Sequence, residues 1–123
     1  MHALIWFITN NEKLPNNTKN VIEDQGNNCY VSIASYWEIG IKNKIGRLDL
    51  NADLHTIFQI IADTGFEALP ITTNHILKNS ELELFHQDPF DRIIIAQSLV
   101  ENMKIITKDG QFSKYTNQLL WEN

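Results

Sequence analysis

The chain has 123 residues, the length of one ordinary domain, and 43% of them are apolar, which is enough for a hydrophobic core. Its single cysteine, Cys29, excludes a disulfide framework, and the net charge of −5 disfavours broad nonspecific binding to nucleic acid. No apolar run approaches the roughly 18 residues of a membrane span. We therefore expect a single domain over residues 1–123 that lies in the cytoplasm and not in a membrane.

The spacing of apolar residues and the helix start and stop signals divide the chain into alternating elements. Helices are predicted over residues 2–9, 18–25, 35–45, 51–64, 73–84 and 89–102, with a loop or short helix over 111–117. Short strands are predicted over residues 29–33, 67–71, 104–107 and 119–121. This alternation indicates an α/β fold with one parallel sheet between helices. Pro70 cannot donate to a ladder, so 67–71 is expected at a sheet edge.

The most informative stretch runs from residue 86 to residue 109. Asp88 is a good N-cap, and Pro89 then occupies the first helical position, where a missing N–H costs nothing. Asp91 follows in the first turn, and Asp109 comes just after the strand at 104–107. Sites of open α/β sheets lie at the carboxyl ends of strands. Asp91 and Asp109 are therefore expected to meet at one edge of the sheet.

Glu38, Asp91 and Asp109 stand out because each lies at the start of a helix or the end of a strand. Carboxylates brought close together repel each other, and a divalent cation relieves that repulsion. Mg²⁺ prefers such oxygen ligands and can activate a water for attack on a phosphate. Each acid also has a purely structural alternative. Glu38 would complete a capping box with Ser35, Asp91 would stabilise its helix start by about 0.3–1 kcal/mol, and Asp109 would form a turn.

Several neighbours of these acids are weaker candidates. Lys42 stands four residues after Glu38 and is either a surface ion pair or a phosphate contact. His86 and Arg92 offer the same choice, and Asp88 is assigned mainly to capping. We keep these residues as candidates for supporting the acids or contacting a phosphate.

Four segments carry a resemblance to a known family: residues 2–6 (HALIW), 35–42 (SYWEIGIK), 88–92 (DPFDR) and 107–109 (TKD). In this order and spacing the chain resembles PIN-domain toxins of the VapC type, from type II toxin–antitoxin systems. The resemblance implies a three-layer PIN-like domain and a Mg²⁺- or Mn²⁺-dependent endoribonuclease that a small antitoxin holds inactive, and it leaves a homodimer open. It implies metal binding by Glu38, Asp91 and Asp109, with Thr107 supporting them, and direct attack of a metal-activated water on RNA.

The start of the chain departs from the family pattern. Family members open with a hydrophobic strand that ends in Asp-Thr-His-Ala-Leu, and here Met1 stands where the Thr would be. The resemblance places that strand in the middle of a five-stranded sheet, between 29–33 and 104–107. Three explanations remain: a misplaced start codon, a truncated relative, or rearranged neighbouring strands. The alternative function is accordingly a catalytically impaired PIN domain that acts as an antitoxin-binding module. A phosphoacceptor receiver domain is disfavoured because 29–33 does not end in Asp.

Overall fold

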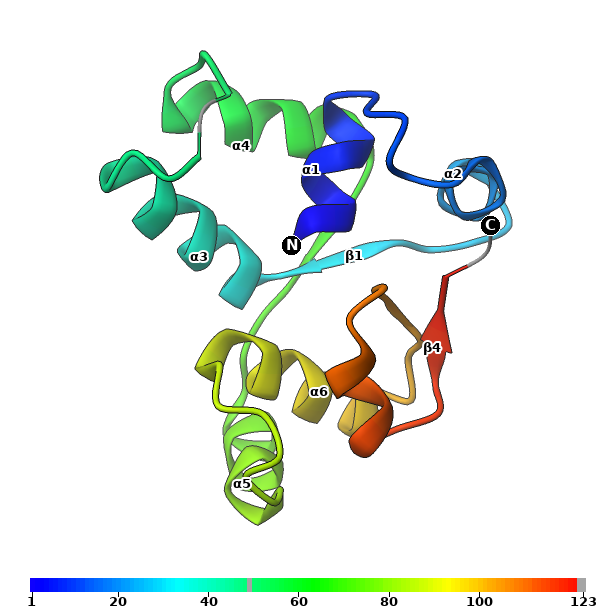
Figure 1. The fold of residues 1–123 in the computed structure, drawn as a ribbon, viewed down its shortest axis with the longest axis vertical. Helices are drawn as coiled ribbons and strands as arrows, with labels where there is room; N and C mark the ends of the chain where they lie inside the picture. The colour runs from blue at the N-terminus through cyan, green and yellow to red at the C-terminus, as the bar shows by residue number, and fades with distance from the viewer. Residues whose placement is uncertain (49, 122–123) are drawn as a thin grey trace.

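The computed structural model describes residues 1–48 and 50–121, and it has the expected α/β composition (Figure 1). The α-helices are α1 (His2–Ile8), α2 (Asn16–Glu23), α3 (Ile33–Lys44), α4 (Leu54–Asp63), α5 (Thr73–Glu81) and α6 (Pro89–Glu101). The strands are β1 (Tyr30–Ser32), β2 (Glu67–Leu69), β3 (Ile105–Ile106) and β4 (Leu119–Leu120), and a 3-10 helix, η1 (Gly110–Lys114), precedes β4. None of the described helices is both long and apolar enough to cross a membrane.

The strands form two separate parallel pairs instead of the single sheet that the sequence predicts. β1 pairs with β2, with Tyr30 opposite Glu67, and β3 pairs with β4, with Ile105 opposite Leu119. Within the described residues no ladder joins β1 to β3. The expected edge position of β2 is confirmed, because β2 pairs with β1 alone and Pro70 follows it directly.

The start of α3 corrects another prediction. Ser32, not Ser35, is the N-cap, and its Oγ accepts a hydrogen bond from the Ala34 N–H at 3.1 Å. The predicted capping box between Ser35 and Glu38 is therefore wrong, because the chain turns from β1 directly into the helix. Glu38 consequently lies in the second turn of α3, where it is only 6% exposed.

The main hydrophobic core joins the first half of the chain. It consists of the apolar side chains Ile5, Val31, Ile39, Ile57 and Ile61, which come from α1, β1, α3 and α4. These elements occupy one half of the molecule in Figure 1, and α5 and α6 occupy the other. Ile95 and Ala96 of α6 are completely buried. The helix that carries Asp91 is thus anchored by apolar packing.

Two polar contacts fix α6 against its neighbours. Gln97 is 1% exposed, and its Nε2 donates to the Pro70 carbonyl at 3.2 Å, just beyond β2. Glu101, the last residue of α6, contacts buried His75 of α5 through Oε2 and Nε2, 3.4 Å apart. Both contacts hold the C-terminal half of α6 against the start of α5.

Candidate metal centre

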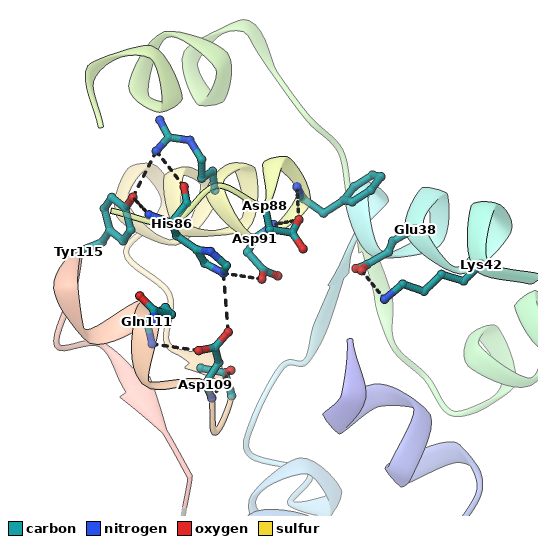
Figure 2. Close-up of polar contacts among 11 residues, drawn as sticks. Glu38, Lys42, His86, Asp88, Asp91, Asp109, Gln111 and Tyr115 are labelled. Atoms are coloured by element: carbon teal, nitrogen blue, oxygen red, sulfur yellow. Dashed lines mark hydrogen bonds and ion pairs between the residues drawn. The ribbon is translucent and has the colours of Figure 1, made fainter. Parts of the chain in front are cut away.

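Three potential metal ligands meet between the start of α6 and the end of β3. His86 Nε2 lies 2.8 Å from Asp91 Oδ2 and 3.6 Å from Asp109 Oδ2. One ligand atom from each of these residues lies within 4.8 Å of the others. Figure 2 shows the imidazole of His86 between the two carboxylates. The structure thus brings Asp91 and Asp109 together, as expected from their places at a helix start and a strand end.

The start of α6 orients Asp91. Asp88 Oδ1 accepts from the N–H of Phe90 at 2.9 Å and from that of Asp91 at 3.3 Å, as its predicted role as N-cap requires. Pro89 occupies the first helical turn without losing a hydrogen bond. With Asp88 occupied in capping, the Asp91 side chain remains available to face His86 and Asp109.

Burial raises the pKa of Asp91 above its usual value, and the negative charge of Asp88 raises it further. The contact with His86 acts in the opposite direction but does not cancel the effect of burial. The surrounding residues therefore stabilise the negative charge of ionised Asp91 less well than water does. A cation beside this carboxylate would relieve that deficit.

Asp109 is fixed by its backbone and by one of its two oxygens. Its N–H donates to Thr107 Oγ1 at 3.1 Å, and its Oδ1 accepts from the Gln111 N–H at 2.9 Å to cap η1. This geometry leaves Oδ2 as the oxygen that faces His86. Thr107 thus holds the turn that presents Asp109, which is compatible with the supporting role that the resemblance implies.

His86 is held in position by a loop contact that the sequence does not reveal. Its N–H donates to the hydroxyl of Tyr115 at 2.8 Å, and that hydroxyl donates in turn to the Glu83 carbonyl at 2.6 Å. The imidazole packs edge-on against Phe112, with ring centroids 6.1 Å apart. Tyr115 lies 29 residues from His86 along the chain, so no local pattern could have predicted this contact.

Arg92 holds the same loop from the other side. It is 8% exposed, and its guanidinium donates to the carbonyls of Glu83 (2.8 Å), Leu82 (3.2 Å), Asn79 (3.2 Å) and His86 (3.4 Å). It also donates to the Tyr115 hydroxyl at 3.2 Å. These bonds engage the donors that a phosphate contact would need. In this structure Arg92 therefore acts on the site through the loop that carries His86.

Glu38 and Lys42 form a separate pair. Glu38 Oε2 lies 2.9 Å from Lys42 Nζ, and Figure 2 shows this pair apart from His86 and Asp109. Glu38 nevertheless lines the same cavity of about 740 Å³ as Asp91 and Asp109. Among the described residues the potential metal ligands that converge are His86, Asp91 and Asp109, without Glu38. The predicted three-acid cluster is thus represented by two acids and a histidine.

The raised pKa of Asp91 leads to a stability prediction. Because the folded pKa exceeds the unfolded value of about 3.9, ionisation of Asp91 destabilises the native state. This cost is absent below the unfolded pKa and is complete above the folded pKa. Asp91→Asn should therefore unfold at a higher temperature than the original chain near pH 7, and the difference should vanish as the pH falls to about 4. Thermal unfolding monitored by circular dichroism across this range measures it. A lower unfolding temperature for the variant at pH 7 would show that the helix-start charge outweighs burial.

The donor set fits a divalent cation. Two carboxylates and an imidazole supply oxygen and nitrogen ligands whose atoms already lie close together. A hard cation would also offset the negative charges that Asp88 adds beside Asp91. Asp91 and Asp109 also line the cavity, and the Asp109 side chain is 42% exposed, so a cation held by these residues would be open to solvent.

One of the comparisons with known proteins finds a match. A family model described as PIN domain matches residues 2–118, which is nearly the whole chain. No curated protein and no solved structure matches the chain.

Proposed function

The chain belongs to the PIN domain family, and from that premise we propose that it is a metal-dependent endoribonuclease of the toxin type. PIN domains are in general nucleases that act on RNA with the help of divalent metal ions. The observation that carries the proposal is the convergence of Asp91 and Asp109 in the lining of one cavity. The proposed reaction is hydrolysis of an RNA phosphodiester bond by water, with no covalent enzyme intermediate.

Each residue of the site has a proposed role. Asp91 and Asp109 hold Mg²⁺ or Mn²⁺, Asp88 and Thr107 fix their backbones, and Glu38 completes the acidic side of the cavity. A divalent ion held by these residues would lower the pKa of a bound water and offset negative charge on the phosphate under attack. Lys42 faces the same cavity and adds a positive charge for the RNA backbone.

We also propose that an upstream strand ending in Asp completes this site between β1 and β3. In parallel ladders alternate residues bond to the same neighbour. The Cys29 carbonyl accepts from β2, and the N–H groups of Ile105 and Thr107 donate toward β4, so the backbones of Tyr30 and Ile106 face away from those partners. Tyr30 and Ile106 line the same cavity. A strand added there would find hydrogen-bonding groups on both sides.

The position of Met1 supports the same proposal. Its amino group interacts electrostatically with Glu38, Asp91 and Asp88, so it lies on the acidic side of the cavity. Burial lowers the pKa of this amino group. In the family pattern an Asp stands two residues before the histidine that matches His2. A carboxylate at that place would therefore lie beside Glu38 and Asp91.

The second candidate function is a binding module for a small antitoxin, and one surface favours it. Four apolar side chains spaced four residues apart are exposed along α3 and at its C-cap: Ile33, Trp37, Ile41 and Ile45. Trp37 is 64% exposed and packs edge-on against Phe90 beside the site. A protein partner that covers this face in the cytoplasm would also block access of RNA to Asp91. A second copy of the chain is the other partner that the resemblance leaves open.

Cleavage of a fluorescent single-stranded RNA separates these functions. We expect little cleavage by the 123-residue chain and strong cleavage by the chain extended with a hydrophobic strand ending in Asp-Thr. Cleavage should require added Mg²⁺ or Mn²⁺ and stop with a chelator, since the acids act through the ion. Failure of both folded chains to cleave would favour the binding module. Strong cleavage by the 123-residue chain would show that the upstream Asp is dispensable.

A further inference from the structure

We propose that His86 is itself a metal ligand through Nε2, and that this nitrogen makes the site select transition-metal ions over Mg²⁺. The inference rests on the proposed function for the presence of a metal, but it concerns a residue outside the acidic set that the sequence predicts. Its starting point is the position of Nε2 between Asp91 and Asp109.

The direction of the imidazole carries the first step. Nε2 is the ring nitrogen within 3.6 Å of both carboxylates, so it points into the space between them. In the neutral tautomer with the proton on Nδ1, the lone pair of Nε2 has this same direction. A cation that binds Oδ2 of Asp91 and Oδ2 of Asp109 therefore meets Nε2 as a third ligand.

The rigidity of the loop carries the second step. The N–H of His86 is bound by Tyr115, its carbonyl accepts from Arg92, and its ring packs on Phe112. The imidazole side chain is only 17% exposed. Swinging the ring away from the carboxylates would disturb this packing. The nitrogen is thus held near the carboxylates before any ion binds, which reduces the cost of using it as a ligand.

The identity of the donor atoms carries the third step. Mg²⁺ prefers oxygen ligands and keeps several waters, whereas an imidazole nitrogen suits the first-row transition metals. For mixed nitrogen and oxygen ligands the affinity rises from Mn²⁺ through Co²⁺ to Ni²⁺. A site of one nitrogen and two carboxylates should therefore bind Co²⁺ and Mn²⁺ more tightly than Mg²⁺, and that preference should depend on His86.

Metal titration without RNA tests the proposal. Binding of Co²⁺ and Mg²⁺ to the full 123-residue chain is measured by calorimetry, and the absorption bands of Co²⁺ report nitrogen coordination. His86→Ala should weaken Co²⁺ binding by about tenfold or more, because even residues that only support a ligand cost 10–100-fold. Mg²⁺ binding should change little. His86→Gln, which offers an oxygen at a similar reach, should also lose the preference for Co²⁺. His55→Ala removes an exposed histidine of α4 and should behave like the original chain.

Equal Co²⁺ affinity in the original chain and in both His86 variants would overturn the proposal and leave His86 as a hydrogen-bond partner of Asp91. Metal binding that depends on His86 but is not accompanied by RNA cleavage in the extended chain would uphold this inference and overturn the proposed function. RNA cleavage that requires a metal ion whose affinity is unchanged by the His86 substitutions would uphold the proposed function and overturn this inference. Thermal unfolding of each variant, run in parallel, identifies any loss of affinity that comes from misfolding.

Discussion

Asp91→Asn should abolish RNA cleavage by the chain that carries the upstream strand, while the fold remains intact. Asn keeps the size of the side chain and can still accept a hydrogen bond from His86. It lacks the negative charge that a hard divalent cation requires. Because the ion supplies several kcal/mol of transition-state stabilisation, the rate should fall by a factor of about 10³ or more. The initial rate of fluorescent RNA cleavage at saturating Mn²⁺ is the measurement.

The controls separate this effect from a change in stability. Asp63→Asn alters an exposed carboxylate of α4 and should leave the rate unchanged. Asp91→Asn itself is expected to be at least as stable as the original chain near neutral pH, because burial raises the pKa of Asp91. Equal cleavage by Asp91→Asn and the unsubstituted extended chain would mean that Asp91 only supports the start of α6.

Arg92→Ala should destabilise the protein more than any substitution at the acids. The change removes the charged donor that the carbonyls of Asn79, Leu82 and Glu83 share. The Asn79 carbonyl keeps the N–H of Leu82, and the Glu83 carbonyl keeps the Tyr115 hydroxyl. A hydrogen bond to a charged group contributes about 1.5–3 kcal/mol, so loss of several such bonds should lower the free energy of unfolding by about 2–4 kcal/mol after relaxation and hydration of the loop. Urea denaturation of the original chain and the variant measures the difference.

Two variants control the Arg92 experiment. Arg92→Lys keeps the charge but presents three donors from one nitrogen, so it should recover only part of the loss. Arg47→Ala removes an exposed arginine and should change the stability by no more than about 0.5 kcal/mol. If Arg92→Ala is as stable as Arg47→Ala, the loop that carries His86 does not depend on the guanidinium.

The sequence predicted those parts of the fold that depend on local signals. Asp88 and Pro89 mark the start of α6 without ambiguity, and Pro70 places β2 at an edge. The start of α3 was mispredicted because Ser32 and Ser35 are both good caps, and only the end of β1 decides between them. The division into two strand pairs does not follow from local signals, because pairing between β1 and β3 is a tertiary property. Only the resemblance, which places a further strand between 29–33 and 104–107, indicated that these two strands would not pair directly.

The candidate site shows the same division between local and tertiary information. The rule that strand ends and helix starts converge brought Asp91 and Asp109 into one hypothesis, and the structure places them together. Glu38 was included on the same rule, but its carboxylate pairs with Lys42 within α3. The position of His86 depends on Tyr115, which is distant in the sequence, and on Arg92, which the sequence offered only as an ion-pair partner or a phosphate contact. The roles of Asp91, Asp109 and Glu38 as metal ligands stay predictions.

The central claim is that water, directed by the acidic site, attacks an RNA phosphodiester bond. The most direct measurement is cleavage of RNA by the extended chain with Mn²⁺ in water enriched in oxygen-18, followed by mass spectrometry of the product ends. We expect one solvent oxygen in the terminal phosphate of the fragment that keeps the phosphate, none in the new hydroxyl of the other fragment, and loss of both products in Asp91→Asn. Products that end in a 2′,3′-cyclic phosphate without solvent oxygen, or a complete absence of products from the folded extended chain, would contradict the claim.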